Sequence, residues 1–436
     1  MLKLTLILIL IWIPSLLLEI GNLDNFFVWR HALTILTGFV SLSYMCLAVL
    51  LSARFKWVEN ITKGLDKGYA LHKKLGIGAT ISLILHWVII KSAHWLIALD
   101  LIVKPHKHKH KGLIEGINWH SLAEHVGEIS FKIFLIFSFI SLVQAISYKT
   151  FKFTHKIAGL LIFAGIFHAA ILIDWNIQSI TMNIAIVPLA IAGIYCSWLS
   201  LSGQIGKNKK SKGLITFVNP LVGSHDKRLA VHFAVKLDKA IDYKEGQFAY
   251  LDFHDNEYAH PFSILNYDQK TNVIEFAVKD LGDYTNKLVN TLNNGHKVTI
   301  EGSYGYFQIS DFTHQVWVGA GIGIVPFISR LYWLQCKGSK EKLSIKKVHF
   351  FYCINSQKDA FFQDEIIAII NGLSFIELHI LDAQKGELLN AEQIKQLVGE
   401  QPFDVSFCGP SAFAKQLQAD LAFSDELFHK EIFKMR

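Results

Sequence analysis

Four histidines in two apolar stretches of the sequence have the spacing of paired metal ligands. His72 and His86 lie fourteen residues apart in one stretch, and His155 and His168 lie thirteen apart in the other. If both stretches are helical, these spacings correspond to rises of about 21 Å and about 19.5 Å. Pairing the imidazoles by depth joins His72 with His155. It also joins His86 with His168, which gives two bis-imidazole sites, as two b-type haems would need.

The direction of these side chains is a stricter test than their depth. Fourteen residues at about 100° each return to within about 40° of the starting face, so His72 and His86 can share one side of a helix. Thirteen residues miss that face by about 140°. The second helix must therefore be distorted, or its two haems must approach from different sides. Gly159 and Gly165 could permit a local bulge. The alternative interpretation is that the histidines are interfacial or relay protons.

The stretches that carry these histidines are long enough to cross a membrane. A transmembrane helix needs about 20 mostly apolar residues, and histidine inside one is costly and therefore usually functional. The first apolar run resembles a signal peptide, but no small-residue cleavage site follows Leu18, so we expect an uncleaved helix. Six segments qualify as spans, at approximately 2–20, 32–51, 70–97, 129–147, 155–174 and 180–201.

Lysine and arginine predict the orientation of these spans. Basic residues concentrate in three connecting segments, 54–74, 149–156 and 207–212. With six helices all three fall on one side, which the positive-inside rule makes cytoplasmic. Both termini and the second half of the chain are then cytoplasmic. The basic segment 104–111 (KPHKHKHK) falls on the outer side, against the rule.

Composition agrees with a membrane half followed by a half outside the membrane. The chain is 51% hydrophobic, and nearly all long apolar runs lie in its first part. The net charge of +7 comes largely from basic residues between those runs, and no nucleic-acid-binding signature is present. The five cysteines have no CxxC spacing, which argues against a disulfide framework and against c-type haem attachment.

The second half predicts two further domains. After a flexible linker at 204–213, residues 214–311 contain short strand-like runs separated by turns, as in a small antiparallel β-barrel. Residues 312–436 alternate strands with helices, which is typical of an α/β domain with a parallel nucleotide-binding sheet. The expected fold is therefore a six-helix transmembrane α-helical bundle at 1–203, a β-barrel domain and an α/β domain.

A glycine-rich turn opens the expected nucleotide domain. Gly319, Gly321 and Gly323 follow the strand-like run VWV, and Pro326 falls just inside the next helix. Glycines at a strand-to-helix turn let backbone amides approach a pyrophosphate, and proline is tolerated in a first helical turn. Such a turn on its own is a weak signal of dinucleotide binding.

The histidine pairs carry a family resemblance. The segments LHKKLGIGATISLILHW and THKIAGLLIFAGIFH, on the third and fifth expected helices, resemble the ferric reductase transmembrane domain shared by ferric reductases and NADPH oxidases. The resemblance implies that two b haems are bound by His72, His86, His155 and His168. It also implies a ferredoxin-NADP reductase-like module in which the barrel binds FAD and the α/β domain binds NADPH or NADH.

Short motifs in the second half extend the resemblance. In the family, an aromatic residue packs on the flavin, a Ser or Thr hydroxyl bonds near its reactive nitrogen, and a CGP segment stands beside the nicotinamide. The flavin residues implied here are His260, Pro261, Phe262, Ser263, Gly282, Thr285, Gly302 and Gly305. The nicotinamide residues implied are the glycine-rich turn with Cys408, Gly409 and Pro410. Phe433 matches a C-terminal aromatic that covers the flavin, so Ser263, Cys408 and Phe433 are the implied catalytic residues.

These expectations predict an enzyme that moves electrons from cytosolic NAD(P)H through FAD and two haems to an outer acceptor. A ferric or cupric chelate is favoured, because His106, His108 and His110 could capture metal in the outer loop, although a merely solvated loop is the alternative. Oxygen, reduced to superoxide, is the other acceptor. A non-enzymatic haem-binding anchor or carrier is the alternative of another class. The choice between NADPH and NADH stays open, with Arg330 and Lys358 as candidate phosphate ligands, and so does the oligomeric state.

Overall fold

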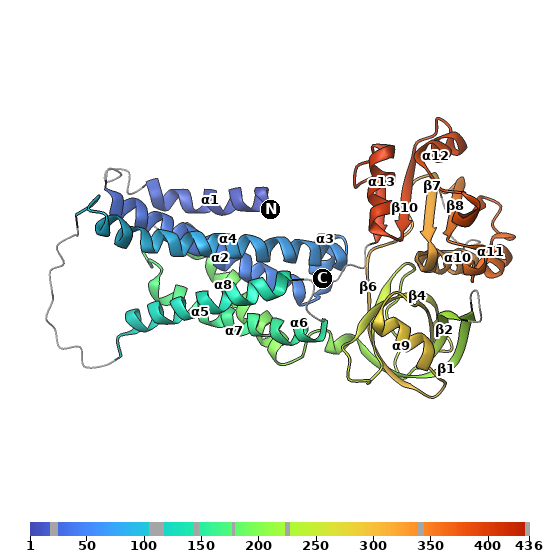
Figure 1. Cartoon of the computed structure of the whole chain (residues 1–436), viewed down its shortest axis with the longest axis horizontal. Helices are drawn as coiled ribbons and strands as arrows, with labels where there is room; N and C mark the ends of the chain where they lie inside the picture. The colour runs from blue at the N-terminus through green and yellow to red at the C-terminus, as the bar shows by residue number, and fades with distance from the viewer. Residues whose placement is uncertain are drawn as a thin grey trace. The chain divides into compact units, whose positions relative to one another are not determined.

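The computed structural model divides the chain into two compact units. Residues 1–62 and 67–205 form the first unit, and residues 63–66 join the second, which starts at Gly206. Figure 1 shows both units, with the colour running from the N-terminus to the C-terminus. The structure describes residues 1–17, 25–103, 117–143, 148–176, 179–222, 227–337 and 344–431. The histidine tract at 106–110 and Phe433 lie outside these residues.

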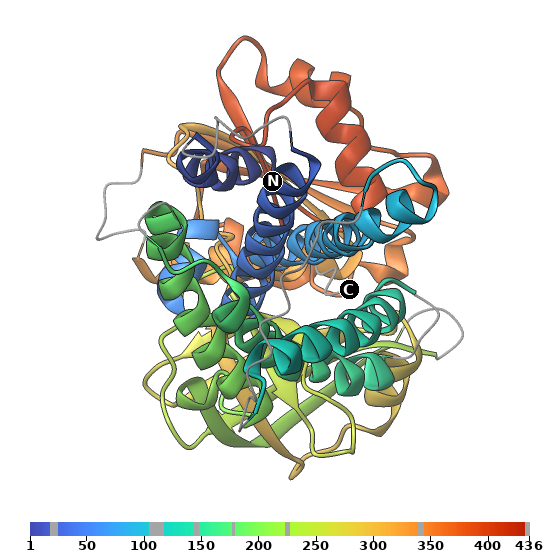
Figure 2. The same ribbon diagram turned by 90° about the vertical axis from the view of Figure 1, so that its left-hand side faces the viewer.

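The first unit is an α-helical bundle, which Figure 2 views nearly along the helix axes. Among the described residues, five stretches of helix are long and apolar enough to cross a membrane. The first expected span corresponds to α1, whose 16 residues are fewer than a full crossing needs. The helices are α1 (Leu2–Leu17), α2 (Phe26–Ser52), α3 (Lys56–Thr62), α4 (Leu65–Ala98), α5 (Trp119–Leu142), α6 (Tyr148–His155), α7 (Ile157–Leu172) and α8 (Ile180–Leu201).

The bundle packs around α2 and leaves apolar side chains exposed on its other helices. Phe39, Leu42 and Cys46 of α2 are buried, with Leu161 of α7 and Ile186 of α8 in the same cluster. Large apolar residues of α4, α5 and α8 stay exposed on the surface of the unit. A helix satisfies its own backbone polar groups, so an exposed apolar helical surface suits contact with lipid.

The barrel domain is a closed six-stranded antiparallel sheet. Its strand order is β1-β2-β5-β4-β3-β6, and pairing of β1 with β6 closes the barrel. The helix α9 (Asp283–Thr291) lies between β5 and β6 in sequence. The strands are β1 (Lys210–Val222), β2 (Arg228–Leu237), β3 (Phe248–Asp252), β4 (His260–Asp268), β5 (Val273–Lys279) and β6 (Lys297–Tyr304).

The expected linker at 204–213 is only partly a connection. A short 3-10 turn, Lys207–Lys209, leads into β1, which begins at Lys210. Lys210 is in register with Glu301 of β6, and the hydroxyl of Ser211 donates to the carbonyl oxygen of Lys239. The last four residues of the expected linker are therefore barrel strand, because their backbone groups complete the closure of the sheet.

The last domain is a parallel sheet with a core on each face. The strand order is β11-β10-β7-β8-β9, with every pair parallel. One core contains residues of α10 and α11, and the other contains residues of α12 and α13. The strands are β7 (His314–Ala320), β8 (Lys347–Ile354), β9 (Ile376–Asp382), β10 (Phe403–Cys408) and β11 (Phe428–Glu431). The helices are α10 (Val325–Lys337), α11 (Gln363–Ile370), α12 (Ala391–Val398) and α13 (Ser411–Leu421).

Close packing of α2 against α8 predicts a glycine requirement. A Cβ added at Gly193 of α8 would lie 2.6 Å from Cys46 Sγ, whereas one at Gly76 of α4 would meet nothing within 4 Å. We expect Gly193→Ala to destabilise the bundle by about 1–3 kcal/mol through overpacking. Gly76→Ala should be neutral or stabilising by up to about 1 kcal/mol. Thermal unfolding in one detergent measures both, and equal midpoints for the two variants would contradict this packing.

Candidate functional site

The structure brings the four histidines together in the two pairs expected from their depth. The ring centroids of His72 and His155 lie 5.8 Å apart, and those of His86 and His168 lie 6.4 Å apart. A metal–imidazole nitrogen bond is about 2 Å long, so two imidazoles on opposite sides of one iron have centroids roughly 6 Å apart. Both pairs therefore fit an iron between their rings.

Each imidazole is oriented by a contact at Nδ1. The Nδ1 of His72 lies 2.7 Å from the carbonyl oxygen of Ala48, and that of His168 lies 2.8 Å from the carbonyl oxygen of Ala123. A carbonyl oxygen can only accept, so these contacts place the proton on Nδ1 and leave the lone pair on Nε2. Such a bond from the second ring nitrogen is the usual support of a metal-binding histidine.

The other two histidines have similar partners. Nδ1 of His86 lies 3.0 Å from the carbonyl oxygen of Thr34 on α2, and Nδ1 of His155 lies 3.3 Å from the hydroxyl of Ser141 on α5. His155 also contacts the rings of Phe137 and Phe151, at centroid distances of 5.0 Å and 4.8 Å. The carbonyl partners of His72, His86 and His168 leave the Nε2 lone pair for a ligand bond, and the Ser141 hydroxyl allows the same form of His155.

The helix that carries His155 and His168 is irregular next to His155. The helix α6 ends at His155, and α7 begins at Ile157, with Lys156 between them. The expected distortion is therefore present, but it lies before Gly159 and Gly165 rather than at either of them. Both imidazoles lie next to a histidine of α4, although thirteen residues separate them.

Two glycines that we did not single out from the sequence make room for the His86–His168 pair. A Cβ at Gly38 of α2 would lie 3.2 Å from Cε1 of His86, and one at Gly127 of α5 would lie 2.3 Å from Nδ1 of His168. Any larger side chain at Gly127 would therefore displace the His168 ring. Glycine is common in transmembrane helices, so neither residue carried a usable signal in the sequence.

The candidate flavin residues lie on the barrel and on the turn before α9. His260, Pro261, Phe262 and Ser263 are the first four residues of β4. The hydroxyl of Thr285 accepts from the amide of Leu281 at 2.9 Å and donates to the carbonyl oxygen of Gly282 at 3.1 Å. Thr285 therefore fixes the turn that exposes the first amides of α9, a suitable arrangement for a phosphate.

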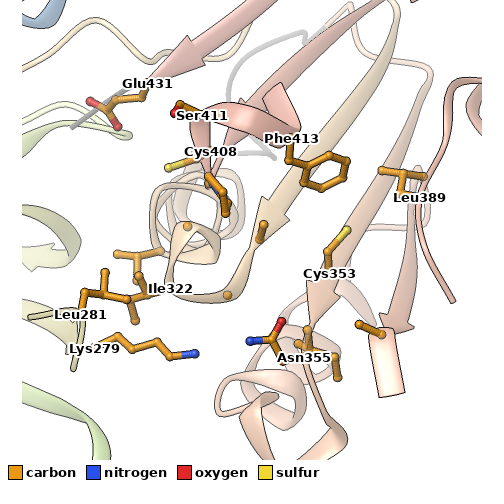
Figure 3. Close-up of a pocket in the computed structure, with 18 of the residues that line it drawn as sticks. Lys279, Leu281, Ile322, Cys353, Asn355, Leu389, Cys408, Ser411, Phe413 and Glu431 are labelled. Atoms are coloured by element: carbon orange, nitrogen blue, oxygen red, sulfur yellow. The ribbon is translucent and has the colours of Figure 1, made fainter. Parts of the chain in front are cut away.

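One cavity joins the candidate flavin residues to the candidate nicotinamide residues (Figure 3). Its volume is about 930 Å³, and it opens at the carboxyl ends of the parallel strands, where such sheets bind nucleotides. Expected site residues that line it are Pro261, Phe262, Ser263, Thr285, Gly321, Gly323, Cys408, Gly409 and Pro410. The expected residues that do not line it are His260, Gly282, Gly302, Gly305, Gly319 and Pro326.

The glycines of the nucleotide turn have distinct structural roles. Gly321 has φ +56°, which a side chain would strain. A Cβ at Gly323 would lie 2.2 Å from the carbonyl oxygen of Cys408, so this glycine lets the turn approach the end of β10. A Cβ at Gly319 would lie 2.7 Å from the side chain of Ile324, so this glycine serves packing below the cavity.

A carboxyl group that sequence analysis missed lies beside Cys408. Glu431 of β11 is in register with Cys408 of β10, and both line the cavity. Burial raises the pKa of the Glu431 carboxyl and of the Cys408 thiol well above their usual values, which favours the neutral form of both groups. Glu431 Oε2 is buried without a hydrogen-bond partner among the described residues. A neutral carboxyl group at this position can donate a proton or a hydrogen bond into the cavity.

Arg330 does not serve as a phosphate ligand. Its side chain is fully buried, and Nη2 donates to the carbonyl oxygens of Phe307 and Gln308 at 3.2 Å and 2.7 Å. The guanidinium also packs over the ring of Phe307 at 4.4 Å. Burial lowers its pKa to about 10, which still leaves it charged at neutral pH. Of the two candidates for recognising a 2′-phosphate, only the exposed Lys358 remains.

Two protein families match the chain. The family described as "Ferric reductase like transmembrane component" matches residues 37–166, and the family described as "FAD-binding domain" matches residues 225–317. The first match contains His72, His86 and His155. The second contains the candidate flavin residues from His260 to Gly305.

Individual relatives match shorter parts of the chain. The reductase component of propane 2-monooxygenase from Rhodococcus jostii (strain RHA1) is 27% identical over 137 residues, which are 30% of this chain and 36% of that protein. A superoxide-generating NADPH oxidase heavy chain of Dictyostelium discoideum is 26% identical over 261 residues, which are 44% of this chain and 37% of that protein. The chain thus spans little more than a third of these relatives.

A solved structure of ferredoxin-NADP+ reductase from Plasmodium falciparum also aligns with the chain. The alignment has a TM-score of 0.45 and 16% identity, and it covers 52% of this chain and 97% of that one.

The close approach at Gly323 yields a prediction for nucleotide binding. We expect Gly323→Ala to weaken binding of NADH and NADPH at least tenfold, because the added carbon collides with the backbone beneath the pyrophosphate turn. FAD content should be retained. Gly372→Ala is the matched control, since its Cβ would lie 3.7 Å from the nearest atom. Nucleotide titration monitored by flavin absorbance measures the effect, and unchanged affinity in Gly323→Ala would contradict the assignment of this turn.

Proposed function

The chain belongs to the ferric reductase and NADPH oxidase family, and we propose that it passes electrons from NAD(P)H to an acceptor across the membrane. Its long apolar helices make it an integral membrane protein. The proposal places the second unit in the cytoplasm, on the strength of the basic segments next to the spans. FAD would convert a two-electron donor into single electrons, and two b haems would carry those electrons through the bilayer.

The observation that carries this proposal is the stacked pair of bis-histidine sites. His72 with His155 and His86 with His168 have ring separations that suit an iron, and each ring has an acceptor or hydroxyl at Nδ1. A structural or proton-relay role would not need two imidazoles facing each other at each of two depths. We propose these four residues as the axial haem ligands.

The cavity in the second unit supports an electron-donating half on the same chain. Ser263 and Thr285 would hold the flavin, and the turn at Gly321 and Gly323 would hold the dinucleotide pyrophosphate. The protonated Cys408 would close the site beside the nicotinamide. This combination favours an enzyme over a haem-binding anchor that depends on a partner for electrons.

The acceptor is proposed to be a ferric or cupric chelate. Bis-histidine ligation leaves no open iron position, so an acceptor must take the electron from the haem edge. The histidine tract at 106–110 is the sequence feature that favours a metal. The similarity to a protein named as a superoxide-generating oxidase favours oxygen as the second candidate.

Anaerobic reduction of the purified, FAD-loaded protein tests the proposal. We expect NADH or NADPH to reduce both haems without another protein. Ferric citrate or oxygen, added afterwards in separate samples, should reoxidise them, and the faster reaction identifies the acceptor. If dithionite reduces the haems but neither NADH nor NADPH does, the result would contradict the proposed enzyme and support a non-enzymatic haem-binding anchor.

Single histidine variants test the ligand assignment. His86→Ala should lower the haem content from two to about one per chain and leave the low-spin spectrum of the other centre. His94→Ala is the control, because His94 lies on the same helix with an exposed ring. The pyridine haemochrome assay measures haem per chain. Full haem content in the alanine variants of all four proposed ligands would refute the assignment.

A further inference from the structure

Three potential metal ligands meet on the nucleotide-binding sheet, outside the nucleotide cavity. His349 lies on β8, and Glu377 and His379 lie on the neighbouring strand β9. His349 is in register with Glu377, so their side chains share one face of the sheet with that of His379. One ligand atom from each of the three lies within 4.8 Å of the other two.

The distances within this cluster fit a single ion. Nδ1 of His349 and Nε2 of His379 lie 3.2 Å apart. Two imidazole nitrogens bound to one tetrahedral zinc at about 2 Å are separated by roughly 3.3 Å. The two carboxylate oxygens of Glu377 lie 3.8 Å from these nitrogens, one from each. A small rotation of the exposed Glu377 side chain would bring an oxygen to bonding distance.

We propose that His349, Glu377 and His379 bind a divalent transition-metal ion of the zinc class, with water in the fourth position. Two imidazoles and one carboxylate with an open position form a ligand set that zinc accepts. The ion would be distinct from the haem irons and from any metal reduced by the protein. The proposal does not depend on the electron-transfer function.

The surroundings of the cluster favour a built site. His349 is 7% exposed, and Phe351 stacks on the ring of His379 at a centroid distance of 4.7 Å. Buried polar groups are costly unless they are paired. A single hydrogen bond between the two imidazoles would satisfy only part of their bonding capacity, whereas an ion would take the lone pairs of both and the charge of Glu377.

Lys347 opposes a cation here. Its Nζ lies 2.7 Å from Glu377 Oε2. The Lys347 side chain is 38% exposed, so its ammonium group can turn into solvent when an ion replaces it. Lys347→Gln should therefore strengthen metal binding rather than abolish it.

The position of the cluster suggests what the ion would do. In the described part of the sheet, β9 is an edge strand, held by its pairing with β8. Cys353 and Leu381, further along the same two strands, line the nucleotide cavity. An ion bound by both His349 and His379 would cross-link β9 to β8 next to that cavity and so stabilise the edge of the sheet.

Zinc binding to the full chain tests the proposal. Because the histidine tract would also bind zinc, every protein should carry His106, His108 and His110 changed to Ala. After treatment with a chelator, the protein is titrated with Zn²⁺ and examined by zinc-edge X-ray absorption. We expect one tightly bound zinc per chain with nitrogen and oxygen ligands, including imidazole, at about 2 Å.

Variants of the cluster make the result decisive. Mutating a residue that only orients a metal ligand typically lowers metal affinity about 10–100-fold. Loss of a ligand itself, in His379→Gln, should therefore weaken zinc binding by about 100-fold or more. Glu377→Gln, at a more exposed position, should also weaken it, and His296→Gln is the control on an exposed turn. Equal FAD content shows that each variant is folded. Zinc affinity unchanged in both cluster variants, or an absorption spectrum without imidazole ligands, would overturn the proposal.

Discussion

The arrangement of the helical bundle depends first on the hydrogen-bonding needs of its buried histidine rings. A ring that is to hold an iron must keep Nε2 free and still satisfy Nδ1 away from water. The bundle meets this need with main-chain carbonyls of neighbouring helices, as at Ala48 for His72 and at Ala123 for His168. Helices must therefore pass close to the rings, and Gly127 provides the space for the closest approach. The contacts of α2 with His72 and of α5 with His168 meet that requirement.

A comparable constraint shapes the second unit. If it binds a nucleotide as proposed, the cavity needs backbone groups close to the ligand and groups held in their neutral form beside its reactive end. Gly323 allows the first, because its missing side chain brings the turn against the end of β10. Burial favours the neutral forms of Cys408 and Glu431, because it raises the pKa of both groups. Ser263 of β4 and Thr285 of α9 line the same cavity as these groups.

Periodic and local patterns in the sequence predicted much of this arrangement. Helical rise alone pairs His72 with His155, and several residues of the motifs that carry the family resemblance line one cavity. The irregularity at Lys156 could not be located from the sequence, because the angular mismatch allows a distortion anywhere between the two histidines and also allows haems on different sides of the helix. Glu431 was missed because its role arises from strand pairing between β10 and β11. Burial of Arg330 was also not predicted, because a charged side chain is normally expected at the surface and only the tertiary fold buries this one.

The central claim is that two irons are each held by two histidines on this chain. Its most direct test is the low-temperature electron paramagnetic resonance spectrum of the oxidised, purified protein, with haem counted per chain. Bis-imidazole ligation at both depths predicts two haems per chain and low-spin ferric signals that account for both. A single haem per chain, or a high-spin signal that accounts for either haem, would contradict it.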